Sequence, residues 1–272
     1  MTPFTPLFPT SASGHRRRTP IHTLVARAVS TLCLLWAPHV SADQVSPERR
    51  FAYTHPSLTE PVGELELETW GTWKNRSGTL RTFAFSHEFE IGLTRHTQLG
   101  LSIANWSVDA RSGKSRFEDA SIEVIHNLTS PITDTFGSAV SAEVAMGERS
   151  TTLEAKLILE KRFGKWVLGW NGALEAAWEG ERFGDLQAST GELTQSIGLG
   201  YDICPCLTIG LEALHTLPLD RWHGPSNAEL YAGPSVTFRQ KHFRVTLGAL
   251  FQTTNRTEEP SAQLRTIVGI EF

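Results

Sequence analysis

The chain has 272 residues, a formal net charge of -4 and a mean hydropathy of -0.20. The charge argues against a nucleic-acid-binding protein, which normally carries a basic excess, and an apolar share of 40% is too high for a disordered chain. No run of about 18 uninterrupted apolar residues is present, so an ordinary membrane-spanning helix is not expected. These averages alone would describe a soluble globular protein.

The first 42 residues differ in composition from the rest. They contain no Asp or Glu and carry four arginines, Arg16, Arg17, Arg18 and Arg27. An apolar run over 28–38 follows, and Val40-Ser41-Ala42 then offers small residues at the two cleavage-recognition positions before Asp43. This order predicts a signal peptide over 1–42, removed on export by the general secretory route. Its removal takes away four positive charges and changes the net charge from -4 to about -8.

Residues 43–61 are predicted to form a poorly structured lead-in that can enter a barrel lumen as a plug, and residues 62–272 to form the barrel. Twelve segments of the latter alternate apolar and polar side chains with period two, which is typical of strands with one apolar face. Their apolar sets span 65–73, 83–91, 99–103, 122–128, 136–146, 153–163, 166–178, 193–201, 207–213, 230–238, 243–251 and 264–272. In the tenth, Pro234 cannot donate to a strand ladder, so a bulge or local break is expected there.

Strand length separates a membrane barrel from a soluble one. Most segments run to about 10–13 residues, whereas soluble strands average about 5–6 and tilted transmembrane strands need about 9–11. Twelve strands also enclose too wide an interior for an apolar lining to fill. We therefore expect an all-β, antiparallel, up-and-down transmembrane β-barrel in a bacterial outer membrane. An even strand count and short connections after even-numbered strands place both termini in the periplasm.

Aromatic residues cluster at the predicted strand ends, where interfacial belts contact the outer-membrane lipid. Trp73, Trp178 and Phe251 are expected at the outer rim. Phe136, Phe163, Trp166, Tyr201 and Phe272 are expected at the periplasmic rim.

The polar face is mostly acidic. The glutamates predicted to line the lumen are Glu64, Glu66, Glu68, Glu88, Glu90, Glu123, Glu143, Glu154, Glu160, Glu175, Glu212 and Glu229. Fewer basic residues share that face: Lys156, Arg162, Arg239, Arg244 and Arg265. Because an incoming cation relieves repulsion among carboxylates, we expect a passive pore or binding lumen for a small cationic or polar solute. The equally weighted alternative is an internal Glu–Arg network that keeps a structural or surface-interaction barrel closed and rigid.

Other chemistry has weaker support. Cys204 and Cys206 lie in a predicted periplasmic turn, where a structural disulfide or a merely stiff turn is favoured over a metal site. A third functional hypothesis is a hydrolase acting on lipid at the outer rim. Its nearest candidates are His126-Asn127, Ser226-Asn227, His55-Pro56-Ser57, and His215 and His223 with Asp220. No catalytic motif supports them, so no enzyme activity, cofactor or metal is predicted.

Two segments resemble known families. The last nine residues, LRTIVGIEF, alternate and end in Phe272, and they resemble the C-terminal signal of bacterial outer-membrane barrels, which implies recognition by the barrel-assembly machinery. The stretch from Phe51 to Trp106 contains FAYTHPSLTEPVGELELETWGTWK and FSHEFEIGLTRHTQLGLSIANW. It is similar to uncharacterised proteobacterial outer-membrane barrels known as domains of unknown function or candidate transporters. That resemblance implies fold and location, and no catalytic residues.

Overall fold

The computed structural model describes residues 48–76, 81–110, 112–148, 150–179, 189–222, 227–254 and 259–272. The predicted signal peptide and residues 43–47 lie outside this part. Among the described residues, no helix has the length and apolar character that a membrane crossing requires.

Twelve strands carry the fold, and each falls on one of the twelve alternating segments. They are β1 (Leu65–Asn75), β2 (Arg81–Thr94), β3 (Thr97–Asp109), β4 (Ser115–Thr129), β5 (Gly137–Gly147), β6 (Ser150–Phe163), β7 (Trp166–Glu179), β8 (Ser189–Cys204), β9 (Leu207–Leu219), β10 (Glu229–Gln240), β11 (Phe243–Gln252) and β12 (Ala262–Glu271). A short 3-10 helix, η2 (Asp220–Trp222), follows β9. The strands are 10 to 16 residues long, which suits a tilted membrane-spanning strand.

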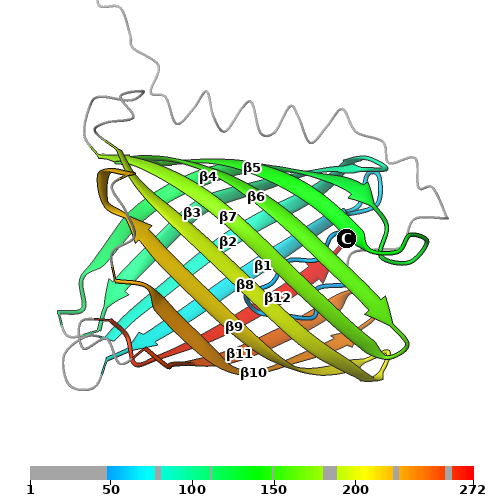
Figure 1. Ribbon diagram of the computed structural model, residues 1–272. Coiled ribbons are helices and arrows are strands. Elements are labelled where there is room, and N and C mark those ends of the chain that lie inside the picture. Colours follow the sequence, from blue (N-terminus) through cyan, green and yellow to red (C-terminus); the bar gives the residue numbers. More distant parts are fainter. Residues whose placement is uncertain are drawn as a thin grey trace, which may run out of the picture. The chain divides into compact units, whose positions relative to one another are not determined.

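Every strand pairs antiparallel with its neighbour in sequence, and β1 pairs with β12 to close the barrel (Figure 1). This confirms the predicted up-and-down topology. Connections after even-numbered strands are mostly brief, as at Gly164-Lys165 and Pro205-Cys206, and define what we call the short-turn end. Connections after odd-numbered strands define the loop end. Phe272 lies at the short-turn end, where its backbone N–H donates to the carbonyl of Leu65 at 2.9 Å.

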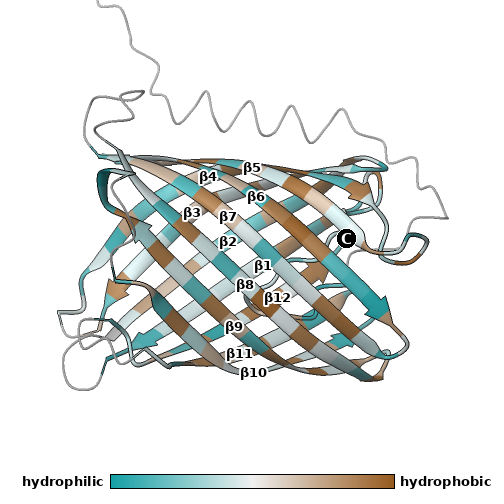
Figure 2. Cartoon of the chain, in the orientation of Figure 1, coloured by the Kyte–Doolittle hydropathy of each residue, from teal (hydrophilic) through white to brown (hydrophobic). Residues whose placement is uncertain are grey.

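The pleat sorts side chains between the two faces of the wall. In β6, Leu153 and Leu157 are exposed on the outer face, while Ile158 and Glu160 are buried on the inner one. Apolar and polar residues alternate in the same way along the other strands (Figure 2). The molecule is therefore apolar outside and largely polar inside, which suits a barrel in lipid.

Seven of the eight predicted belt residues lie at strand ends with accessible rings. Trp166 and Tyr201 are register partners on β7 and β8, with ring centroids 4.9 Å apart. Trp178 does not fit the prediction, because only 4% of it is exposed. Its register partner Ser189 accepts a hydrogen bond from the indole of Trp222 at 2.8 Å. The chain after β9 thus lies over this corner of the barrel, which local alternation could not predict.

Of the two alternatives expected at Pro234, the structure shows a local break and no bulge. β10 keeps one register with β9 through Pro234, which pairs with Leu211. The ladder to β11 lacks pairs only at Gly233 and Pro234 and resumes without a shift. The chains approach so closely at Gly233 that an added Cβ would lie 1.9 Å from the carbonyl oxygen of Ala249. The missing proline donor is therefore accommodated by a local gap in the ladder.

A charge on the outer face tests the apolar wall. Replacing Leu157 at the middle of β6 with Arg should lower the free energy of unfolding by about 2–4 kcal/mol in a lipid bilayer, because the charge would lie at mid-depth. The matched variant Thr151→Arg lies near the loop end of the same strand and should cost about 0–1 kcal/mol. Urea unfolding in vesicles measures both, and equal costs would contradict a membrane-embedded wall.

Candidate functional site

The interior of the barrel holds an N-terminal segment, residues 48–61, which we call the plug. It has no regular helix or strand, yet most of it is buried. The backbone N–H groups of Ala52 and Tyr53 donate to Glu212 on β9 at 2.8 and 2.7 Å. Near its other end, the N–H of Glu60 donates to Gln98 on β3 at 2.9 Å. Because β3 and β9 are six strands apart in a ring of twelve, the plug crosses the lumen from wall to wall.

A floor of glycines receives the plug's first aromatic ring. An added Cβ at Gly198 would lie 2.8 Å from the ring of Phe51, and one at Gly200 or Gly210 would lie 3.1 or 3.2 Å from it. These glycines face inward on β8 and β9, so the absence of side chains creates the space that the ring occupies. Tyr53 continues the packing in a buried apolar cluster with Ala52, Tyr231 and Leu250.

Polar side chains of the wall take up the plug's backbone groups. Glu160 accepts the N–H of Ser57 at 2.9 Å, and Asn127 donates to the carbonyl of the same residue at 2.6 Å. Asn171 accepts the N–H of His55 at 2.5 Å and donates to its carbonyl at 3.2 Å. Two of the predicted lumen glutamates, Glu160 and Glu212, are therefore plug ligands.

Arginines join the plug to the wall from both sides. Arg49 of the plug lies 3.0 Å from Glu68, and Arg244 of β11 donates to Glu66 and Glu68. Arg265 of β12 donates to the carbonyl of Ala52 at 3.2 Å, and its guanidinium lies 4.0 Å from the ring centroid of Tyr53. Each of these groups is largely withdrawn from solvent, where ion pairs are screened less.

The inner wall carries a continuous line of acidic side chains. Register pairing connects one strand to the next along it, through Glu271, Glu66, Glu90, Gly100, Glu123, Glu143, Glu154, Glu175 and Glu192. We call these eight glutamates the carboxylate row. Gly100 interrupts it, but an added Cβ there would lie 2.6 Å from an oxygen of Glu88, which leans over the gap.

The carboxylate row leads from the plug toward the loop end. Glu66 is the second residue of β1, at the short-turn end, and Glu192 is the fourth residue of β8, at the loop end. Like charges on directly opposed residues destabilise a sheet. Lys156 relieves part of the repulsion, 3.3 Å from Glu123 and 3.0 Å from Glu154.

A polar cavity lies beside the part of the carboxylate row that is nearer the loop end. It encloses about 620 Å³ of empty space and is lined by Asn105, Asp119, Glu143, Ala145, Thr152, Glu154 and Glu175. Four of these seven residues are acidic, and none is basic. The cavity therefore favours a cationic or hydrogen-bond-donating solute.

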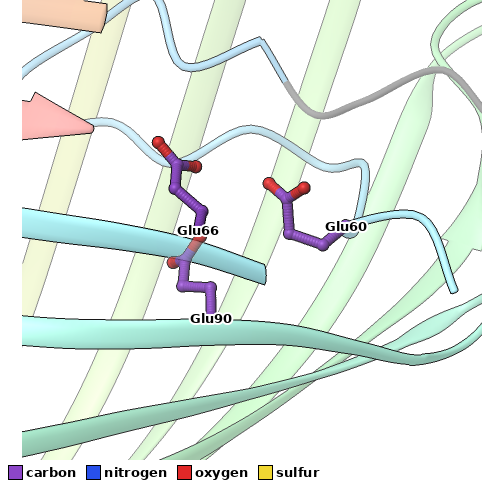
Figure 3. A group of neighbouring side chains, drawn as sticks. All are labelled: Glu60, Glu66 and Glu90. Carbon is purple, nitrogen blue, oxygen red and sulfur yellow. The ribbon is translucent and has the colours of Figure 1, made fainter. Parts of the chain in front are cut away.

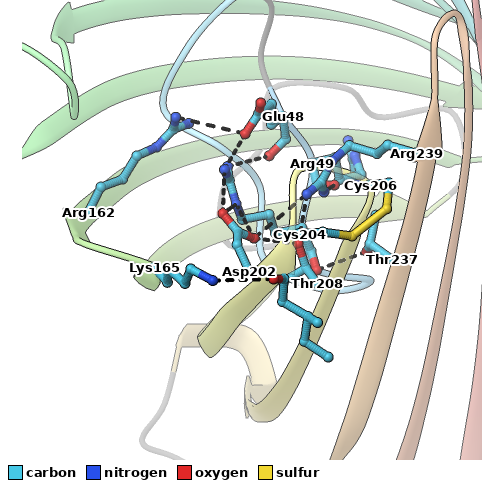
Figure 4. A network of polar contacts seen from close by, with 12 residues as sticks. Glu48, Arg49, Arg162, Lys165, Asp202, Cys204, Cys206, Thr208, Thr237 and Arg239 are labelled. Carbon is cyan, nitrogen blue, oxygen red and sulfur yellow. Dashed lines mark hydrogen bonds and ion pairs between the residues drawn. A yellow bond between two sulfur atoms is a disulfide. The ribbon is translucent and has the colours of Figure 1, made fainter.

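Basic residues dominate the short-turn mouth instead. A second cavity of about 1020 Å³ is lined there by Arg50, Arg162, Lys165 and Arg239, with Glu48 and Asp202 as counter-charges (Figure 4). Arg50 donates to both oxygens of Asp202, at 3.0 to 3.2 Å. Cys204 and Cys206 form a disulfide across the adjacent turn. This side of the short-turn mouth is thus basic, whereas the cavity nearer the loop end is acidic.

The remaining predicted lumen residues lie at the two ends. Glu64 precedes β1, and Glu229 at the loop end accepts a hydrogen bond from Tyr231 at 3.1 Å. Sequence reasoning missed Arg49, Arg50, Glu60, Asp119, Glu192, Asp202 and Glu271. Strand parity could have found Asp119, Glu192, Asp202 and Glu271, whereas the three plug residues have no periodic signal.

The hydrolase candidates do not converge among the described residues. His126 lies on the outer face of β4 and contacts Thr97 at 3.1 Å, while Asn127 points inward to the plug. His55 and Ser57 are bound inside the lumen. His223 and Ser226 lie outside the described residues. Among the described residues, these candidates do not bring a nucleophile, a base and an orienting third group together.

Two plug residues have strongly shifted pKa values. Burial, with a further contribution from Arg49, lowers the pKa of His55 well below its usual value, so the imidazole is neutral. Burial and the nearby carboxylate of Glu66 raise the pKa of Glu60 to about 9.

The sequence of this chain matches one family of proteins. A model of a family of unknown function, DUF6662, matches residues 43–266. The chain belongs to the DUF6662 family. The matched region includes the plug and the barrel as far as residue 266. No curated protein matches this sequence.

The chain is similar to several solved structures. The NanC porin matches with a TM-score of 0.54 and 10% identity, over 76% of this chain and 98% of the porin. The KdgM porin has a TM-score of 0.44 and 10% identity, over 76% and 98%. The translocator domain of the autotransporter NalP from Neisseria meningitidis has 0.46 and 11%, over 92% and 97%. At these identities the likeness to the NanC porin shows that this DUF6662 protein has an outer-membrane-type barrel fold.

The ring of Phe51 should anchor the plug. Phe51→Ala leaves a cavity over the glycine floor and should destabilise the docked plug by about 3–5 kcal/mol. Hydrogen exchange of the Ala52 and Tyr53 amides, measured at constant pH, should accelerate accordingly. Phe243→Ala removes an equal ring from the outer face and should leave these amides protected. Unchanged exchange in Phe51→Ala would mean that the ring does not hold the plug.

Acid should weaken the plug through His55. The folded-state pKa is below the unfolded value, so stability contributed by the neutral imidazole is complete above about pH 6.5 and is lost as pH falls further. Glu60, whose pKa is raised, gains stability over the same range, so His55 is isolated by comparison with His55→Gln, which can still accept from Arg49. Between about pH 7.5 and about pH 5.5 the urea midpoint of the wild type should decrease relative to that of His55→Gln; an equal change in the two proteins would assign the effect to other groups.

Proposed function

We propose that this DUF6662 protein is an outer-membrane barrel whose lumen admits or binds small cationic solutes from the loop end. The observation that supports this most directly is the carboxylate row, which reaches from the plug to the loop end beside an acidic cavity. In this proposal the short-turn end faces the periplasm, as in bacterial barrels with brief periplasmic turns. The C-terminal strand ending at Phe272 would be the segment recognised by the barrel-assembly machinery.

Electrostatics explains the expected preference. Carboxylates arranged on opposed strands raise one another's energy, and a cation that enters among them lowers it. Rings of acidic side chains select cations in channels for this reason. Lys156 is the basic residue that contacts the middle of the row. Among the described residues, no ion pair includes Glu143, Glu175 or Glu192, so these three carboxylates remain available to a solute.

The plug controls how far such a solute can travel. It crosses the lumen between β3 and β9, and the basic cluster beyond it repels cations at the short-turn mouth. A solute entering from the loop end therefore meets attraction first and obstruction second. Complete passage requires the plug to shift, whereas binding in the acidic cavity does not.

The same contacts support a second function. The plug is held by hydrogen bonds to Glu212, Glu160 and Asn171 and by a hydrogen bond from Arg265. A plug fixed in this way also suits a closed structural barrel that presents its loops to a surface partner. The two functions differ in conductance. A closed barrel gives no steady current, and a solute channel gives a current that depends on the row.

Reversal potential in a salt gradient separates the two. The purified mature protein in a planar bilayer should conduct with preference for cations, and Glu154→Gln combined with Glu175→Gln should reduce that preference, because both charges line the acidic cavity. Asp220→Asn removes an equal charge from the exposed helix η2 and should leave the reversal potential unchanged. Anion preference would contradict the proposal, and absence of conductance would rule out passage of a solute through the lumen.

A further inference from the structure

A carboxylate of the plug lies buried against two carboxylates of the wall. Glu60 precedes a tight turn in which the N–H of Glu64 donates to the carbonyl of Pro61 at 3.0 Å. Gly63 has a φ of 82°, which glycine adopts without strain, and its N–H donates to Gly92 of β2 at 2.9 Å. With the N–H of Glu60 bound to Gln98, the backbone on both sides of this carboxylate is fixed to the wall.

The three side chains come from three separate segments. Glu60 belongs to the plug, Glu66 to β1 and Glu90 to β2, and the last two are register partners (Figure 3). One carboxylate oxygen from each lies within 4.8 Å of the others. Only 1% of Glu60 is exposed, and neither of its carboxylate oxygens has a hydrogen-bond partner among the described residues.

The surrounding positive charge is insufficient. Five glutamates gather here, because Glu66 and Glu90 also adjoin Glu68 and Glu88. Two guanidinium groups oppose them: Arg244 contacts Glu66 and Glu68, and Arg49 contacts Glu68 at 3.0 Å and Glu90 at 3.9 Å. None of these four ion pairs includes Glu60. A buried, unpaired carboxylate is costly, so the cluster requires a proton or a cation.

We infer that Glu60, Glu66 and Glu90 bind one hard divalent cation, of which Ca²⁺ is the type, and that this ion fastens the plug to the barrel wall. Carboxylate oxygens are the ligands that such ions prefer. Ligand oxygens about 2.3–2.6 Å from Ca²⁺ stand at most about 5 Å apart, which matches the spacing of these three groups. The site is independent of the proposed conduction, because the ion would be a fixed fastener and not a permeating solute.

Calcium binding by the full mature protein tests the inference. After treatment with a chelator, the detergent-solubilised protein is titrated with CaCl₂ in a calorimeter, and one saturable site per chain is expected. Glu60→Gln removes a charged ligand and should weaken binding by about tenfold or more. The matched variant Glu179→Gln removes an equal charge from the exposed end of β7 and should bind Ca²⁺ as the wild type does.

Thermal unfolding distinguishes an ion from a proton. If Ca²⁺ binds, it should raise the Tm of the wild type and of Glu179→Gln, but not that of Glu60→Gln. If Glu60 instead holds a proton, Ca²⁺ will leave all three Tm values unchanged, and the inference fails. It also fails if Glu60→Gln binds Ca²⁺ as tightly as the wild type. Neither result affects the expected ion selectivity, which depends on Glu154 and Glu175.

Discussion

Compensation of buried negative charge is the constraint on which this structure depends. An apolar outer face obliges the inner face to carry the polar residues, because the pleat allows each strand only two faces. Here that inner face brings glutamates into direct register on successive strands, an arrangement that opposes strand pairing. The barrel is therefore stable only if other groups enter the lumen to offset the charge.

The plug supplies much of that compensation, although its own composition is not strongly basic. Its contribution comes largely from backbone N–H groups, which donate to Glu212 and Glu160. Hydrogen bonds to a charged acceptor are stronger than those between neutral groups. A segment without regular secondary structure suits this role, because its N–H groups are not used in a ladder and remain free to turn toward the wall. The plug and the acidic lumen are thus parts of one interaction.

Two parts of the barrel wall have different roles. On β8 and β9, Gly198, Gly200 and Gly210 provide an uncharged surface on which Phe51 lies. On β4 to β7, the row presents Glu123, Glu143, Glu154 and Glu175. Packing on one side fixes the position of the plug, and that position determines which glutamates the plug neutralises and which stay open to a solute. The cavity beside Glu154 and Glu175 follows from this division.

Alternation predicted the barrel well and its contents poorly. The period of two is a local property, so twelve strands, their order and the inward glutamates followed from the sequence. The hydrogen bond from Trp222 to Ser189, the register partner of the buried Trp178, joins segments that are distant in sequence. The partners of Glu60 and Arg49 were likewise unpredictable, because the plug has no period to indicate which way a side chain points.

Charge along the lumen gives the assembly a direction. Acidic residues line the loop-end cavity, and basic residues line the short-turn mouth. In the proposed function, a cation that enters from the loop end approaches the basic cluster to leave, so the acidic cavity would concentrate it before the plug. Motion of the plug would separate Glu212 from its backbone donors and expose further carboxylate to the lumen. The exposed carboxylate would attract a cation more strongly at the moment when the plug moves aside. The glutamates that bind the plug and close the lumen would therefore also favour a cation inside it.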